Sequence, residues 1–241
     1  MLATAISCLR SAVTQLNAVH NQVSLTEELG GVATEKVPLY GNINRALLGS
    51  RSPSAFGKMA ERAVDMGFET VKCAPFDEVN RQLSVDESLR ASELGLARVA
   101  AVRSAIGDQI DLLVDCHSRF LPEVAGSVAN RLAELNIGWF EEPFQPKTDA
   151  DRLSDLSKNI SVTVAGAEGI YGKNAFVDLV EKGSVSVIMP DVKHCGGVFE
   201  AYAAGRASIA LGADVSLHSP SGPVSQLASA HVTAAIGGGR P

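Results

Sequence analysis

The sequence predicts an α/β fold in which parallel strands alternate with helices, as in a (β/α) barrel of the TIM type. Short, nearly continuous apolar segments alternate with longer amphipathic segments along the 241 residues. Polar residues recur at the ends of the apolar segments at intervals of about one β/α unit. Hydrophobic residues make up 46% of the chain and charged residues 20%, which allows a packed core and argues against wholesale disorder.

The apolar segments are expected to form seven strands. Most are nearly continuous in apolar residues, which is typical of parallel strands buried on both faces. Short strand–helix connections predict right-handed crossovers between neighbouring parallel strands. The predicted strands span residues 37–43, 68–75, 111–117, 137–143, 161–169, 185–193 and 213–219.

The segments between the strands carry helix start signals. Ser52 followed by Pro53 predicts an N-cap and first turn, and Ser84 with Glu87 predicts a capping box. The first ~30 residues are expected to form a separate helix that ends at Gly30. Further helices are expected at 124–135, 176–180 and 198–211, and the last residues, 237–241, are expected to form an exposed loop.

Composition excludes several classes of protein. The chain has 21 Lys and Arg against 27 Asp and Glu, a net charge of −6, and no basic stripe that would bind nucleic acid or an anionic membrane. Its four cysteines lack paired spacing, which argues against a disulfide scaffold or a zinc ribbon. No apolar run reaches the ~18 residues of a membrane helix, and the N-terminus lacks signal-peptide features. A cytoplasmic α/β protein is therefore expected.

Polar residues follow five consecutive predicted strands at matched positions. Successive members are separated by 26, 27, 23 and 27 residues, which is close to the length of one β/α unit. Residues at equivalent points of successive units face the same mouth of a barrel, where such barrels place their chemistry. The five residues are Asp115, Glu141, Glu168, Asp191 and His218.

The three carboxylates Asp115, Glu141 and Glu168 predict a metal site. Carboxylates that converge from adjacent strands repel each other unless a cation lies among them. Oxygen ligands favour a hard ion, and few protein ligands with room for water favour Mg²⁺ over Ca²⁺. The alternative for each carboxylate alone is a surface or loop-capping role.

His218 is expected to pair with Asp191, since an Asp–His pair fixes the tautomer and makes the imidazole a competent base. A structural histidine is the alternative. His117 points to the same side of its strand as Asp115, where it acts near the metal or serves only as a ligand or hydrogen-bond partner. Lys72 would bring a cation to the same mouth, and a solvated surface lysine is its alternative.

Several segments together resemble the enolase superfamily, in its mandelate racemase-like branch. They cover roughly residues 35–230 and read YGNINR, VKCAPFDE, VDCHSR, WFEEP, AGAEG, IMPDVKHCGG and LHSPSGP. The resemblance implies that Asp115, Glu141 and Glu168 hold Mg²⁺ and that Asp191 and His218 form the base dyad. Enolase-superfamily sites use a Lys or His base with Mg²⁺ ions.

Two departures narrow the resemblance. Racemases and cycloisomerases of this branch carry Lys-x-Lys at the second strand, whereas here Ala74 stands in the second lysine position. The segment from Asp115 to Arg119 instead resembles acid-sugar dehydratases of the galactonate type, in which the residue matching His117 is the acid that helps hydroxide leave. His194 also matches the dehydratase pattern and, like Arg119, is expected to bind substrate.

The resemblance implies an Mg²⁺-dependent acid-sugar dehydratase. His218 would remove the proton α to the carboxylate, and His117 would protonate the departing 3-hydroxyl. Lys72 would bind the substrate carboxylate and stabilise the charge of the enediolate as it forms. A racemase or epimerase of the same superfamily and a catalytically inert fragment or binding subunit are the alternatives.

The resemblance also implies a domain organisation. Residues 1–36 are expected to be a linker helix region from a capping domain, and residues 37–241 an incomplete barrel of the enolase C-terminal domain type. Seven strands are recognisable, and the eighth strand and the N-terminal capping domain are absent from the pattern. A homo-oligomer is expected for the full-length protein.

Overall fold

The computed structural model describes residues 2–32, 34, 36–237 and 239–241. Its contacts divide the chain into two compact units, Leu39–Ala165 and a unit made of Met1–Pro38 with Gly166–Pro241. The seven predicted strands are all present, and their order in the sheet is their order in the sequence. This confirms the predicted parallel α/β architecture of seven strands with helices between them.

The Leu39–Ala165 unit contains the first strands of the sheet. Neighbouring strands are parallel, with Val71 opposite Leu112 and Asp115 opposite Glu141. Apart from exposed Asp111 and Asn42, the residues of these strands are buried, because helices cover one face of the sheet and side chains fill the other. The strands are β1 (Gly41–Asn42), β2 (Thr70–Cys73), β3 (Asp111–Asp115), β4 (Trp139–Glu141) and β5 (Val164–Gly166), whose last residue belongs to the other unit.

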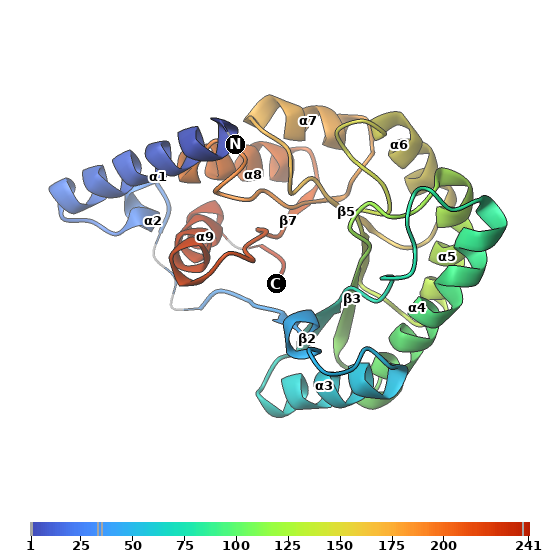
Figure 1. Ribbon diagram of the computed structural model, residues 1–241. Coiled ribbons are helices and arrows are strands. Elements are labelled where there is room, and N and C mark those ends of the chain that lie inside the picture. Colours follow the sequence, from blue (N-terminus) through green and yellow to red (C-terminus); the bar gives the residue numbers. More distant parts are fainter. Residues whose placement is uncertain (1, 33, 35, 238) are drawn as a thin grey trace. The chain divides into compact units, whose positions relative to one another are not determined.

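The helices of this unit begin where the sequence predicts. The Ser52 hydroxyl accepts a hydrogen bond from the amide of Ala55, and Ser84 and Glu87 form the expected capping box. In Figure 1 these helices lie outside β2 and β3, and α3 packs along α4. They are α3 (Pro53–Asp65), α4 (Val85–Ile106), α5 (Pro122–Ala133) and α6 (Ala150–Asn159), with a 3₁₀ turn, η1, at Asn44–Ala46.

The second unit joins the N-terminal helices to the last strands. Helix α8 packs against α1, α7 and α9, and α2 packs on α9. Val187 of β6 lies opposite Asp214 of parallel β7. The elements are α1 (Leu2–Asn21), α2 (Leu25–Glu28), α7 (Lys173–Glu181), β6 (Val187–Ile188), α8 (Val198–Ala210), β7 (Asp214–Val215) and α9 (Pro223–Ile236).

One of two predictions for the ends of the chain was wrong. The expected single N-terminal helix is two helices, because Gln22 adopts a left-handed conformation (φ 56°) and Ser24 starts α2 with its own capping box to Glu27. The expected C-terminal loop is present in the described residues 237 and 239–241, which are exposed or half-exposed, and the amide of Arg240 donates to the Val215 carbonyl at 2.9 Å and ties the loop to β7. The predicted division at residue 36 stays a prediction.

Within the described ranges, every helix is too short or too polar to span a lipid bilayer.

The packing of α4 yields a stability prediction. A Cβ at Gly95 would lie 2.1 Å from Cδ1 of Phe76, a buried ring stacked edge-on against Phe120 at 4.9 Å. Gly95→Ala is therefore expected to lower the free energy of unfolding by about 1–3 kcal/mol, because the ring has no room to retreat. The measurement is the urea midpoint followed by circular dichroism.

Gly126→Ala in α5 is the matched control. A Cβ at Gly126 meets only Leu156 Cδ1 at 3.8 Å, so this helical glycine should gain about 0.5–1 kcal/mol on replacement by alanine. Equal midpoints for the two variants would contradict the packing described for α4.

Candidate active site

Asp115 and Glu141 end neighbouring parallel strands and are opposite each other in the register. Both side chains are almost completely buried, with relative exposures of 5% and 1%. Burial, reinforced by the charge of Asp115, raises the pKa of Glu141 to about 7, although Lys72 opposes the shift. Two buried carboxyl groups, Asp115 and Glu141, thus lie at the end of the β3–β4 pair.

Lys72 on β2 is the counter-charge of this pair. Its Nζ lies 2.8 and 2.7 Å from the two carboxylate oxygens of Glu141 and 4.7 Å from the centre of the Tyr40 ring. Burial disfavours the charged ammonium, but Glu141, Tyr40 and Asp115 outweigh it and raise the pKa of Lys72. With 1% exposure Lys72 is not a solvated surface lysine, so that alternative is wrong.

Two aromatic residues complete this cluster and were not predicted from the sequence. The Trp139 indole Nε1 donates to Glu141 Oε2 at 3.0 Å, and Tyr40 packs edge-on against Trp139 at 6.3 Å. The signal for Trp139 was available, since a residue two positions before Glu141 faces the same side of a strand. Tyr40 begins the resembling segment YGNINR, but nothing in that segment predicts its contact with Lys72.

His117 lies directly against Asp115. Its backbone amide donates to Asp115 Oδ1 at 3.0 Å, and its ring Nε2 lies 3.0 Å from Asp115 Oδ2. Burial alone would raise the pKa of Asp115, but the contacts with His117 and the charge of Lys72 lower it. His117 has a left-handed backbone (φ 48°) and leaves half of its side chain exposed. It therefore combines a fixed position with access from outside.

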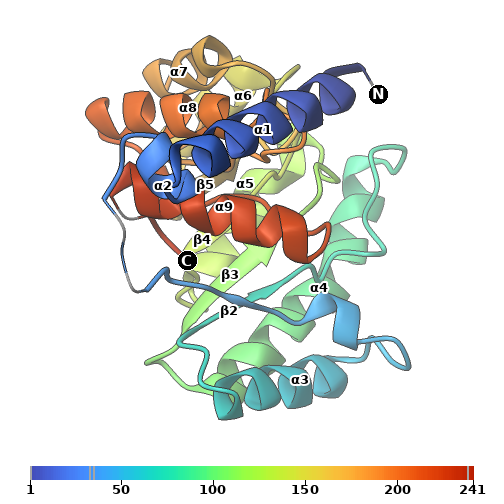
Figure 2. The same cartoon turned by 90° about the vertical axis from the view of Figure 1, so that its left-hand side faces the viewer.

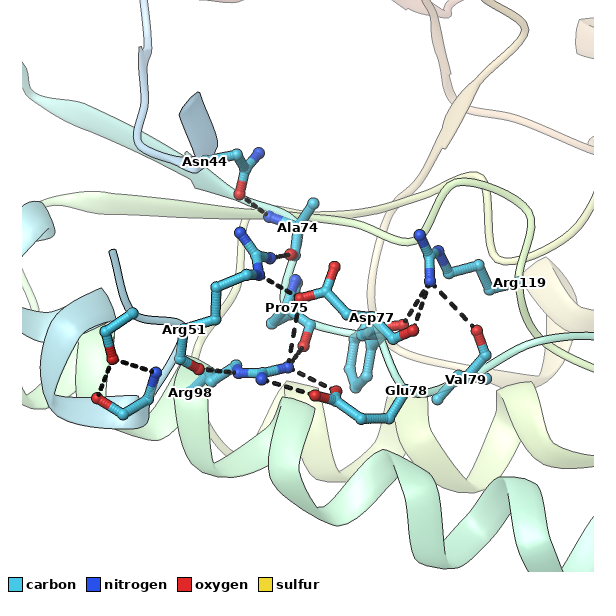
Figure 3. Close-up of polar contacts among 12 residues, drawn as sticks. Asn44, Arg51, Ala74, Pro75, Asp77, Glu78, Val79, Arg98 and Arg119 are labelled. Carbon is cyan, nitrogen blue, oxygen red and sulfur yellow. Dashed lines mark hydrogen bonds and ion pairs between the residues drawn. The ribbon is translucent and has the colours of Figure 1, made fainter. Parts of the chain in front are cut away.

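Arg119 braces the loop that follows β2. Its Nη1 donates to the carbonyl oxygens of Phe76 (3.3 Å), Asp77 (2.8 Å) and Val79 (3.4 Å), as Figure 3 shows in part. These contacts are structural, and the predicted contact of Arg119 with substrate stays a prediction.

Two further arginines, one in the loop before α3 and one on α4, bond the same loop (Figure 3). Arg51 bonds the Ala74 carbonyl at 2.7 Å and the Asp77 carboxylate, and Arg98 bonds the Pro75 carbonyl at 2.6 Å and forms a two-bond pair with Glu78. Donors from α4 and from two loop residues thus bond the backbone that follows β2.

The second unit holds a network of polar side chains centred on Asp191. Asp191 is fully buried, and its Oδ2 lies 2.9 Å from His218 Nδ1 and 3.0 Å from the Lys193 ammonium. On its other side, His218 Nε2 lies 2.9 Å from Glu168 Oε2. The hydrogen bond that the strand spacing predicted between Asp191 and His218 is present, and the catalytic role of the pair stays a prediction.

These contacts shift the pKa values of His218 and Asp191. Burial lowers the pKa of His218, but the hydrogen bonds and charges of Asp191 and Glu168 outweigh it and raise the pKa to about 9. Burial would raise the pKa of Asp191, yet its bonds to His218 and Lys193 lower it. His218 thus binds a carboxylate on each ring nitrogen, with Asp191 fully buried and Glu168 partly exposed. Lys193 was not singled out from the sequence.

His194 is partly buried and contacts two side chains. Its Nδ1 lies 3.1 Å from the Thr4 hydroxyl of α1, and its Nε2 lies 3.3 Å from the Lys193 ammonium. The predicted contact of His194 with substrate stays a prediction.

The residues fit a metal ion in part. The ranges that the structure describes contain no group of three or more His, Cys, Asp or Glu side chains placed to hold one. Asp115 and Glu141 nevertheless offer adjacent buried carboxyl groups, a donor set that suits a hard cation. Glu168, the third predicted ligand, belongs to the other compact unit.

Comparison with known proteins shows the family. The sequence profile of the Enolase C-terminal domain-like family matches residues 55–240, and the chain belongs to this family. A D-gluconate dehydratase of Thermoproteus tenax is 31% identical over 222 residues, which cover 92% of this chain and 43% of that protein. A D-galactonate dehydratase of Variovorax paradoxus is 26% identical over 96% of this chain and 58% of its own length.

A solved structure agrees with this family. The crystal structure of a member of the enolase superfamily from Salmonella Typhimurium superposes with a TM-score of 0.87 at 26% identity, covering 97% of this chain and 62% of that one. The chain therefore spans about half the length of the curated relatives it matches.

The Lys72–Glu141 pair yields a testable prediction. Lys72→Met leaves the buried Glu141 carboxylate without its counter-charge, so the free energy of unfolding at neutral pH should fall by about 3–5 kcal/mol. The double variant Lys72→Met/Glu141→Gln should recover much of this loss, because no unpaired charge remains.

Urea denaturation of the two single variants, the double variant and the parent chain measures the coupling. A Lys72→Met variant as stable as the parent, or a double variant no more stable than Lys72→Met, would contradict a mutual pair.

Proposed function

We propose that the chain carries the catalytic part of an acid-sugar dehydratase, a hydro-lyase that acts on a sugar-acid carboxylate. The observation that carries the proposal is the His218–Asp191 pair, a buried carboxylate that holds an imidazole by Nδ1 at 2.9 Å. The curated relatives named above are dehydratases of D-gluconate and D-galactonate. The particular sugar acid is left open.

We infer that Asp115, Glu141 and Glu168 are ligands of Mg²⁺. The support is the position of each carboxylate after a successive strand, together with the burial of Asp115 and Glu141 side by side. When bound, Mg²⁺ supplies a Lewis acid for the substrate carboxylate. Lys72 adds a fixed positive charge beside Glu141.

His218 is the proposed base. The bond from Asp191 to Nδ1 fixes the ring, so Nε2 is the nitrogen that takes the proton α to the substrate carboxylate. Nε2 contacts Glu168 in the ligand-free chain, and it becomes a base when that contact is released and the ring is neutral. Lys193 shares Asp191 and thereby holds the carboxylate in place.

His117 is the proposed acid. Its half-exposed ring rests on Asp115, with Nε2 3.0 Å from Oδ2, so the ring is held in place and remains accessible. Breaking the α C–H bond and the C3–O bond releases one water when His117 gives its proton to the departing hydroxyl. The remaining enol becomes a 2-keto-3-deoxy acid by moving a proton from oxygen to carbon. Ala74, without an ionisable side chain, leaves no second base next to Lys72, which favours elimination over racemisation.

A panel of mono- and diacid sugars with Mg²⁺ tests the reaction. Mass spectrometry should find a keto acid that has lost one water, and in D₂O the substrate or product should take up deuterium at the α carbon. His218→Asn should reduce both by at least about a thousandfold, because the ring that accepts the proton is gone.

The control is Ser54→Ala, a change on exposed α3 that should leave both signals intact. An isomer of unchanged mass would point to a racemase or epimerase instead, and parental exchange in His218→Asn would contradict the base assignment.

Mg²⁺ is expected to stabilise the folded chain. A ligand that binds only the native state adds about 2.7 kcal/mol to the free energy of unfolding at a hundred times its Kd, and the melting temperature rises accordingly. The shift should be larger in Lys72→Met than in the parent, because the cation then supplies the charge that Glu141 has lost. Glu141→Gln should reduce the shift. No shift in the parent at millimolar Mg²⁺ would contradict the metal site.

A further inference from the structure

The chain that follows β3 makes a turn of two consecutive left-handed residues. His117 and Ser118 have φ angles of 48° and 56°, and neither is glycine. Left-handed backbone is uncommon for residues with a Cβ, and two such residues in succession persist only where the surroundings hold them. The turn lies directly beyond Asp115, which ends β3, and Cys116. The backbone of the proposed acid His117 is therefore held by contacts outside its own segment.

The chain that follows β4 supplies these contacts. The strands β3 and β4 run side by side (Figure 2), and alternate amides continue their hydrogen bonding beyond the strand ends. The amides of Cys116, Ser118 and Phe120 donate to the carbonyls of Glu141, Glu142 and Pro143 at 2.9, 2.7 and 3.0 Å. The Glu142 amide in turn donates to the Ala165 carbonyl of β5 at 2.9 Å, so the accepting segment is itself tied to its neighbour.

A side-chain bond joins two of the residues that the backbone already joins. The Ser118 hydroxyl donates to Glu142 Oε2 at 3.0 Å. Glu142 is only 7% exposed and has a left-handed φ of 39°. A carboxylate is costly to bury, and buried carboxylates are found where they are bonded. Ser118 thus contacts Glu142 through both its amide and its hydroxyl, and we call these two residues the Ser118–Glu142 pair.

We propose that Glu142 is a positioning residue that acts through Ser118 on His117. The His117 amide and ring Nε2 each lie 3.0 Å from an oxygen of Asp115, so both contacts depend on the direction of a single residue's backbone. Asp115 bonds His117 itself, and the Ser118–Glu142 pair holds the residue that follows it. The inference rests on the proposed function, in which His117 is the acid, and it names the residue that keeps this acid in place.

The position of His117 matters for one of two fates of the deprotonated substrate. In the first, the proton held by His218 returns to the α carbon and re-forms the C–H bond. In the second, the C3–O bond breaks, its electron pair leaves with the oxygen, and the His117 proton completes a water molecule. A displaced His117 slows only the second fate, because the first uses His218 alone. Loss of the pair should therefore change the partition between the two, which a general loss of structure does not.

Turnover in D₂O with Mg²⁺ measures this partition, with the first acid of the sugar panel that the parent chain dehydrates. His218 then returns a deuteron, so recovered α-deuterated substrate reports the first fate and keto acid reports the second. In Ser118→Ala and in Glu142→Leu the ratio of deuterated substrate to keto acid should rise at least about tenfold, because a small displacement of an acid costs much of its effect. The double variant should not exceed the larger single effect, since the two residues act through one bond.

Two further variants separate positioning from a general effect. Glu142→Gln keeps an oxygen that accepts from the Ser118 hydroxyl, so it should change the ratio much less than Glu142→Leu does. Ser84→Ala removes a matched hydroxyl–carboxylate bond, that of Ser84 to Glu87 at 2.6 Å, and should keep the parental ratio. A parental ratio in Ser118→Ala, or an equal fall of deuterated substrate and keto acid in both pair variants, would overturn the proposal.

The placement of the His117 ring is measurable without turnover. Diethylpyrocarbonate modifies accessible imidazoles, mass spectrometry locates the modified residue, and exposed His20 on α1 is the reference within each sample. Modification of His117 relative to His20 should rise at least about threefold in Ser118→Ala, which is the order of one lost hydrogen bond. A parent that dehydrates no acid of the panel would contradict the proposed function instead. Equal His117 modification in the parent and in Ser118→Ala would overturn the positioning role whether or not the parent turns over.

Discussion

The buried ion pair between Lys72 and Glu141 is the interaction on which the β2–β4 end of the sheet depends. Parallel strands end side by side, so charged residues at those ends enter a poorly hydrated environment together. Both carboxylate oxygens of Glu141 bond the Lys72 ammonium. The Trp139 indole donates to Glu141, and the Tyr40 ring lies against the Lys72 ammonium. The arrangement still leaves Asp115 next to Glu141, and this pair of buried carboxyl groups is what suits the end of the sheet to a cation.

Asp191 is the corresponding buried charge in the second unit, where the polar contacts are arranged around it. It is completely buried, and three donors converge on its two oxygens: the His218 ring, the Lys193 ammonium and the Lys193 amide. Fixing Asp191 fixes His218, and the α1–α8 packing extends the chain of contacts through His194 to Thr4. In each unit a buried, fully bonded group thus positions a more accessible histidine, His117 on Asp115 and His218 on Asp191.

The sequence was sufficient where a local pattern determines the structure. The seven strands, the Ser52 cap and the Ser84 capping box were predictable because period and capping chemistry act over a few residues. The Asp191–His218 bond followed from equal spacing along a parallel sheet. Contacts made by long side chains across elements were not predictable, as with Tyr40 on Lys72, the three carbonyls bound by Arg119, and Lys193 on Asp191. The break after α1 was missed because the Ser24–Glu27 box was overlooked.

Ligation of Mg²⁺ by Asp115, Glu141 and Glu168 is the central proposal and is directly measurable. Calorimetric titration of the parent chain should give one Mg²⁺ site per chain. Glu141→Gln and Glu168→Gln should each weaken binding by at least about tenfold, while Glu93→Gln on the outer side of α4 should bind like the parent. Parental affinity in Glu168→Gln would contradict Glu168 as a ligand.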